Sequence, residues 1–155
     1  MITYSEYEEM IVERLKSSDI EVSPLPTINE LNDTRSFTKP RIYVIYTGST
    51  FQDSKQLGDF AQNETLNYEL YMIARTRGGA NGLFEVAEEA IQRMLKWKLP
   101  DATHKITLAS FGYKDGIQNH WQYVLSFSFP RVRVMREEPE DLTFIKKITF
   151  NTHEV

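Results

Sequence analysis

Apolar residues recur every three or four positions at the start of the chain, and this spacing predicts a helix over residues 4–17. Thr3 and Glu6 have the spacing of a capping box, in which each side chain satisfies a backbone N–H group of the first turn. Acidic residues occupy the other side of this helix, so we expect one face on the core and one in water. The apolar face carries Tyr4, Tyr7, Ile11 and Leu15, with Met10 beside them.

The same spacing returns over residues 83–95 and predicts a second amphipathic helix. Asn81 is the expected N-cap, and Pro100 prevents the helix from continuing. Acidic residues lie early in the segment and lysines late, which is the order that the helix dipole favours. The apolar positions are Leu83, Val86, Ala87, Ala90, Ile91, Met94 and Leu95.

Five other segments have the alternation, or the β-branched and aromatic composition, that is typical of strands. They are residues 20–24, 41–47, 64–75, 105–113 and 117–129. Gly48-Ser49 is expected to end the second strand, and Asp115-Gly116 suits a tight hairpin between the last two. One face of the last strand is expected to lie on the core, with Trp121, Tyr123, Leu125, Phe127 and Phe129 on it.

Two further alternating segments follow Phe129-Pro130, where the last core strand is expected to end. Val132 and Val134 lie on the first, and Phe144, Ile148 and Phe150 on the second. An isolated hairpin is marginally stable in water. Our hypothesis is therefore that residues 130–151 form a β-arm that packs on a neighbouring subunit. The alternative is a hairpin that folds back onto its own sheet.

The order of elements predicts an α+β fold, with two helices packed on one face of a mostly antiparallel sheet. The order is α-β-β-β-α-β-β plus a C-terminal β-hairpin arm. A length of 155 residues fits one domain. We expect residues 1–130 to form the main α+β domain and residues 131–155 to be a C-terminal β extension of it. Two long polar connections, residues 25–40 and 48–63, are candidate contact loops.

Composition narrows the function classes. A net charge of −4 and a pI of about 5.4 disfavour a protein that wraps nucleic acid. The same charge would suit a surface that DNA passes without sticking, but it is also common in bacterial cytosolic proteins. The absence of cysteine excludes disulfides and thiolate metal sites. No secretory signal and no apolar run long enough for a bilayer are apparent, so we expect a soluble, cytoplasmic protein without membrane contact.

Residues that could carry chemistry do not converge in the sequence. His104, His120 and His153 stand apart from one another and from carboxylates at ligand spacing. The glycine-rich stretch 78–82 precedes a helix, where phosphates can bind, but it lacks the Walker lysine and the dinucleotide glycine spacing. We therefore expect no enzyme, no catalytic residue, no cofactor and no metal; a hydrolase without metal or cysteine is the least favoured reading.

Several short signatures resemble the tail terminator family of Mu-like prophages. A strand ends in Tyr46-Thr47-Gly48-Ser49-x-Phe51, and a polar loop leads to a long strand that closes in Ile73-Ala74-Arg75. A glycine-rich turn then enters a helix of the form Gly82-Leu83-x4-Glu88, and a Trp121-Gln122-Tyr123 strand follows. The resemblance covers roughly residues 1–130 and includes no catalytic motif, so no active-site residue can be carried over.

The resemblance implies a phage structural protein that forms a ring, sixfold by expectation, on the end of the tail tube. The implied partners are further copies of the chain, the tail tube protein and a head-completion protein, in the host cytoplasm and then in the virion tail. The alternative is a small adaptor that grips a protein partner with the loops at 25–40 and 48–63. The residues expected at a subunit interface are Phe51, Gln52, Val132, Val134, Phe144, Ile148 and Phe150.

Overall fold

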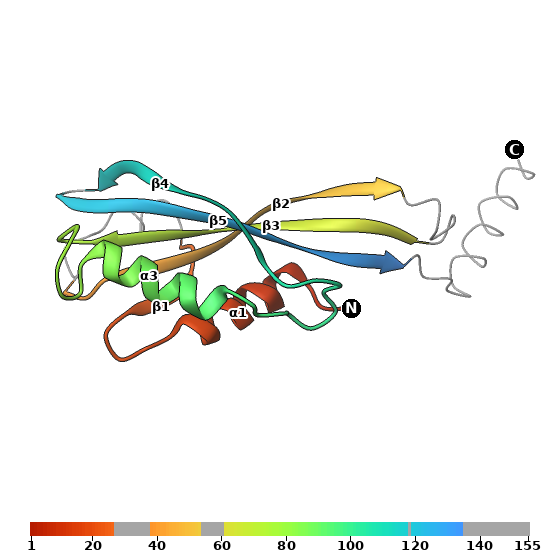
Figure 1. Ribbon diagram of the computed structural model, residues 1–155, viewed down its shortest axis with the longest axis horizontal. Helices are drawn as coiled ribbons and strands as arrows, with labels where there is room; N and C mark the ends of the chain where they lie inside the picture. The colour runs from red at the N-terminus through yellow and green to blue at the C-terminus, as the bar shows by residue number, and fades with distance from the viewer. Residues whose placement is uncertain (27–37, 54–60, 118, 135–155) are drawn as a thin grey trace, which may run out of the picture.

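Two helices cover one face of a five-stranded sheet in the computed structural model, which describes residues 1–26, 38–53, 61–117 and 119–134 (Figure 1). Within these residues the order is α-β-β-β-α-β-β, so the predicted α+β class is confirmed. The elements are α1 (Tyr4–Leu15), β1 (Glu21–Pro24), β2 (Arg41–Asp53), β3 (Ala61–Ala74), α3 (Leu83–Met94), β4 (Thr107–Ile117) and β5 (His120–Val134).

The sheet has the strand order β1-β2-β3-β5-β4. The short strand β1 runs parallel to β2, and the three other neighbouring pairs are antiparallel. β3 is the central strand, and it pairs along its whole length with β5, from Ala61↔Val134 to Ala74↔Trp121. The three longest strands, β2, β3 and β5, are therefore adjacent and form the middle of the sheet.

The core lies between the helices and the sheet. Tyr7, Ile11 and Leu15 of α1 are buried on it, which confirms the predicted apolar face. From the sheet, alternate residues of β3 and β5 enter the same core, including Leu66, Tyr68, Leu70, Leu125, Phe127 and Phe129. Each fully buried large side chain contributes about 1.5–3 kcal/mol relative to an exposed one.

The helices begin and end for local reasons. Thr3 caps α1 by accepting a hydrogen bond from the backbone N–H of Glu6 at 3.1 Å, as the capping-box spacing predicts. The prediction that Asn81 caps the second helix is wrong, because Asn81 adopts a positive φ of 58° and Gly82 takes the cap position. Leu95 also leaves the core; it lies after the last residue of α3 and is exposed.

Three strands, β2, β4 and β5, extend further along the chain than predicted. β2 does not stop at Gly48-Ser49 but passes through a register shift between Tyr46 and Gly48 and continues to Asp53. A glycine can relieve such a bulge without ending the strand. The loop expected at 48–63 is thus strand at both ends, and only residues 54–60 between them lie outside the described part.

The turn between the last two strands is also displaced. Asp115-Gly116 lies within β4, which continues to Ile117, and Asn119 adopts the positive φ of 67° instead. A second register shift, between Lys114 and Ile117, accommodates the extra residues. Trp121, expected in the core, remains 37% exposed because it lies near this turn at the end of the sheet.

The last correction concerns the proposed arm. β5 does not end at Phe129-Pro130 but runs on to Val134, so residues 130–134 belong to the subunit's own sheet. Proline lacks a backbone N–H and is therefore tolerated mainly where a strand has a neighbour on one side. Pro130 is in such a place, because it pairs with Thr65 of β3, whereas β4 pairs with β5 only as far as Ser128. Residues 135–151 of the expected arm lie outside the described residues.

Candidate functional site

The three longest strands continue past α1 and end together at one end of the molecule (Figure 1). We call this end the strand tip and define it as residues 50–53 of β2, 61–64 of β3 and 131–134 of β5. Its residues are held in register by two antiparallel ladders, with Phe51 opposite Glu64 and Glu64 opposite Arg131. The tip is thus a three-stranded ribbon with defined faces.

Four of the residues expected at a subunit interface come together at the strand tip. Gln52 pairs with Asn63, and Asn63 pairs with Val132, so these three share the face turned away from the helices. Phe51 lies on the opposite face and is 49% exposed, and Val134 is 60% exposed at the strand end. Phe144, Ile148 and Phe150 lie outside the described residues, and their expected role stays a prediction.

A buried charged cluster fixes the base of this tip. Glu64 and Arg131 are 0% and 1% exposed, and Arg131 Nε donates to Glu64 Oε1 at 2.8 Å. Arg133 Nε donates to the same oxygen at 3.1 Å, and the Tyr4 hydroxyl donates to Glu64 Oε2 at 2.6 Å. Since each oxygen of the carboxylate accepts at least one hydrogen bond, the buried charge is compensated.

The same cluster ties the beginning of the chain to β5. Arg131 donates through a terminal nitrogen to the backbone carbonyl of Ile2 at 2.6 Å. Its guanidinium carbon lies 5.4 Å from the ring centroids of both Tyr4 and Tyr7, within cation–π range. The Tyr4 ring stacks on that of Tyr46 with centroids 4.1 Å apart. This cluster therefore joins the first turn of α1 to three strands of the sheet, β2, β3 and β5.

The ionisation of Glu64 reflects these contacts. Burial alone would raise the pKa of this carboxyl, but the hydrogen bonds from Tyr4, Arg131, Ser49 and Arg133 together lower it to about 2, against an ordinary value of 4.5. For Arg131, burial lowers the pKa, yet the bonds to Glu64 raise it above its ordinary value. Both groups are therefore charged at neutral pH, and the cluster acts as a fixed ionic joint.

Sequence reasoning missed this cluster. Glu64 and Arg131 are separated by 67 positions, and no local pattern links them. The only local signal is the position of Arg131 and Arg133, which continue the face of Phe127 and Phe129 into what proves to be the same strand. Arginines that continue a core face need an acidic partner, and Glu64 occupies the equivalent position on β3.

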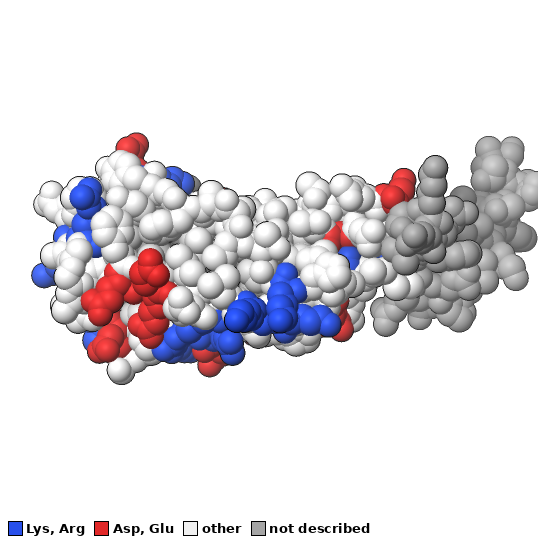
Figure 2. Space-filling view, in the orientation of Figure 1, with Lys and Arg blue, Asp and Glu red and all other residues white. Residues whose placement is uncertain are grey.

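The sheet presents unpaired strand edges in the described part of the chain. β1 pairs only with Arg41–Val44 of β2, and β4 pairs with β5 only as far as Ser128, so both outer strands of the strand tip have a free side there. One bridge, Ala102↔Arg131, touches the β5 side. Figure 2 shows that charged side chains gather along the helices, whereas the strands seen in that view are largely uncharged.

Other candidate chemistry is sparse in the described residues. A hollow is lined by Asp19, Lys39, Arg75, Asn81 and His120 among others. Among the described residues, no group of three or more His, Asp or Glu side chains could hold a metal ion. No described helix is long and apolar enough to cross a membrane. The expectations of no enzyme, no cofactor and no metal are untested by these observations and stay predictions.

Comparison with known proteins gives one family. A family model described as Gp37 protein matches residues 11–152, which is most of the chain. No curated protein gives a significant match. The matched range includes the strand tip, Glu64 and Arg131, as well as the segment beyond β5 that the tail terminator resemblance left out.

Proposed function

Since this chain belongs to the Gp37 protein family, which is phage-related, we propose that it is a structural protein of the phage tail and acts as a tail terminator. In this role identical subunits form a ring, sixfold by expectation, on the last ring of the tail tube. The ring stops tube growth and offers a docking surface to a head-completion protein. It is made in the host cytoplasm, ends in the virion tail, and needs neither cofactor nor nucleic acid sequence.

The observation that carries this proposal is the braced strand tip. Phe51 and Val134 are exposed apolar residues on a projecting ribbon, and the buried Glu64–Arg131 pair joins β3 to β5 at the base of this ribbon. Exposed strand edges without a partner favour association with another chain. A rigid projection of this kind suits a contact surface, because little conformational entropy is lost on binding.

The shape of the subunit also supports a ring. The strand tip lies at one end of the long sheet and the β4–β5 turn at the other (Figure 1). Head-to-tail contacts between two different patches close into rings when the rotation between subunits allows it. The two ends of this sheet provide such different patches within one small domain.

The test is tube capping with the full-length chain. Purified tail tube protein from the same phage is polymerised with and without this protein, and tube lengths and ends are measured by negative-stain electron microscopy. We expect shorter tubes with a distinct ring at one end. The double variant Phe51→Ser/Val134→Ser should lose capping. Leu95→Ser, which alters an apolar residue of similar exposure at the end of α3, should retain it. Unchanged tube lengths with the wild-type protein would overturn the proposal.

A further inference from the structure

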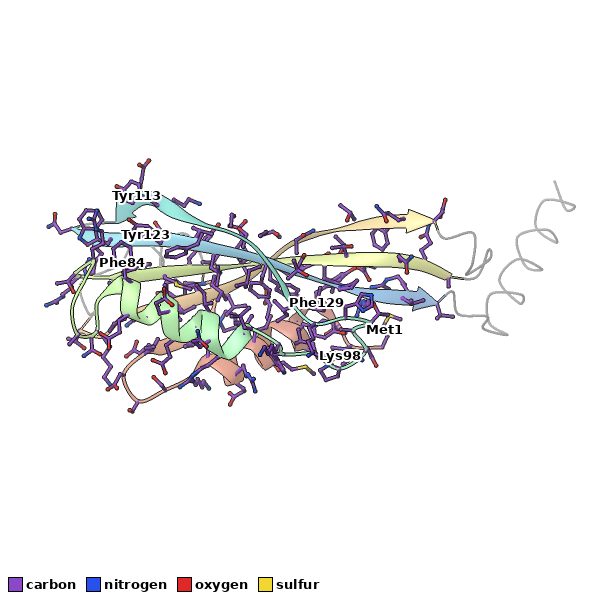
Figure 3. All side chains as sticks on the ribbon, in the orientation of Figure 1. Met1, Phe84, Lys98, Tyr113, Tyr123 and Phe129 are labelled. Atoms are coloured by element: carbon purple, nitrogen blue, oxygen red, sulfur yellow. The ribbon has the colours of Figure 1, made fainter. Side chains whose placement is uncertain are left out.

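An exposed aromatic cluster lies at the end of the sheet opposite the strand tip (Figure 3). It is formed by Phe84 of α3, Phe111 and Tyr113 of β4, and Trp121 and Tyr123 of β5, and we call these five residues the aromatic patch. Tyr123 is at its centre, with the rings of Phe84, Phe111 and Tyr113 at centroid distances of 5.4, 5.2 and 5.7 Å. Arg77 lies over two of the rings, 5.5 Å from Phe84 and 5.0 Å from Trp121.

The subunit itself leaves this patch open. α3 packs on β3 and β5, and β4 lies outside these two strands at the edge of the sheet. Phe84, Phe111, Tyr113 and Trp121 are consequently 39%, 37%, 58% and 37% exposed. Aromatic residues and arginine are the side chains most enriched where protein partners bind, because they bury large rigid surfaces. The patch therefore has the composition of a binding site rather than of solvated surface.

The size of the patch indicates a short segment as its occupant. With about 200 Å² per ring, these exposures leave roughly 350 Å² of aromatic surface open. This is comparable with the largest patch on many monomers and well below the roughly 800 Å² per partner of a standard protein interface. A peptide segment that inserts a few apolar side chains would cover it.

The chain contains one such segment beyond its described residues. Residues 142–150 read LTFIKKITF and carry five large apolar side chains, and residues 137–141 before them carry four acidic ones. Arg77, which lies over two rings of the patch, is the complementary charge to these acidic residues, and the nearby Glu85 is engaged, since its carboxylate accepts from the N–H of Asn81 at 3.1 Å. Residues 142–150, which include Lys146 and Lys147, thus match the patch in apolar content, and the acidic run 137–141 before them supplies the complementary charge.

The course of β5 keeps the start of this segment, as far as Phe144, away from its own patch. From Tyr123 at the patch centre to Val134 the strand advances about 37 Å, at ~3.4 Å per residue. Phe144 follows Val134 by ten residues, and fully extended these span at most about 36 Å. A chain that must first reverse its direction cannot bring Phe144 back to its own patch, and of the five apolar residues only those near the end of the segment, Ile148 and Phe150, have enough chain before them to return there. A neighbouring subunit's patch is not subject to this limit.

We infer that the aromatic patch of one subunit binds residues 142–150 of a second copy of this chain. The contact is head-to-tail, because the segment leaves from the strand-tip end and the patch lies at the other end. It rests on the proposed function only in the assumption that subunits associate, and it adds to the strand tip a second contact, between the aromatic patch and this segment.

Photocrosslinking of the full-length chain tests this contact directly. The photoreactive residue p-benzoylphenylalanine replaces Tyr113, or Leu95 as a matched exposed control, and ¹⁴N- and ¹⁵N-labelled subunits are mixed before irradiation. We expect mass spectrometry to find position 113 joined to residues 135–155 in mixed-isotope pairs, and no such product from position 95. Phe144→Ala should lower the yield about tenfold, as loss of an interface anchor does, whereas Thr143→Ala should leave it unchanged.

The outcomes separate this inference from the proposed function. The irradiation is carried out on the protein alone and on tube ends, beside the tube-capping assay. Capping without any product between position 113 and residues 135–155 overturns the inference and leaves the tail terminator role in place. Mixed-isotope products without capping support the inference and argue against that role. Products confined to one subunit show that the segment binds its own chain and also overturn the inference.

Discussion

Glu64 and Arg131 face each other at one register position of β3 and β5, and a 2.8 Å ion pair joins their side chains inside the protein. Neither side chain has measurable contact with solvent beyond 1%. In such a pair the two charges are stable only together, because either one alone would remain desolvated. The first two predictions concern this pair.

Removing one partner should be strongly destabilising. Arg131→Met leaves the Glu64 carboxylate buried without its buried cationic partner, and we expect a loss of about 3–5 kcal/mol in the free energy of unfolding, measured by urea titration. The double variant Glu64→Leu/Arg131→Met should regain much of this loss, since no charge remains buried. A double variant as unstable as Arg131→Met would show that the packing, and not the unpaired charge, dominates.

The same pair predicts the response to acid. The pKa of Glu64 is lowered to about 2 in the folded protein from an ordinary 4.5, so its ionised form stabilises the fold above pH 4.5. This contribution is lost as pH falls from 4.5 towards 2. Other carboxylates also titrate in that range, so the difference in unfolding free energy between wild type and Glu64→Gln isolates it. That difference should shrink steadily below pH 4.5; a constant difference down to pH 2 would contradict the lowered pKa.

The end of β4 makes a glycine indispensable. A Cβ added at Gly116 would collide with the backbone carbonyl oxygen of His120, whereas one at Gly112 would meet no atom within 4 Å. We expect Gly116→Ala to cost about 1–3 kcal/mol and Gly112→Ala to be nearly neutral in thermal unfolding. Equal melting temperatures for the two variants would place the close approach, and with it the displaced turn at Asn119, in doubt.

Two truncations separate the sheet from the segment beyond it. A chain that ends at Val134 retains all of β5 and should keep most of its melting temperature but lose self-association, measured by light scattering. A chain that ends at Arg131 also loses Arg133, which donates to Glu64, and should be clearly less stable. If the chain ending at Val134 unfolds, residues 135–155 stabilise their own subunit and the trans contact is wrong.

Local pattern was sufficient for the layers of the fold but not for the length of its strands. Helical periodicity placed Tyr7, Ile11 and Leu15 on the core, and alternation did the same for Phe127 and Phe129. Gly48 and Pro130 were interpreted as ends because both residues weaken isolated strands. In the folded protein each of them is paired with a residue of β3, and this pairing allows the strand to continue past it.

The candidate site was predictable only in part, for a related reason. Phe51, Gln52, Val132 and Val134 were selected as interface residues, and the structure places them at one tip, although their role in assembly is still a prediction. The ion pair beneath them and the aromatic patch each depend on register between strands that are distant in sequence. Register is set by the pairing of whole strands with their neighbours and turns, and the local pattern along one strand does not reveal which distant residue lies opposite.

The bond from Arg131 to the carbonyl of Ile2 joins positions 129 residues apart, almost the two limits of the described chain. A ribosome must therefore synthesise the chain as far as Arg131 before this bond between the beginning of the chain and β5 can form. The pairing of β3 with β5 likewise forms only after α3 and β4, which lie between these strands in the chain, have been synthesised. Incomplete chains lack both the ionic joint and the strand tip, so only finished subunits can present a contact surface, and nascent fragments are excluded from any assembly that uses it.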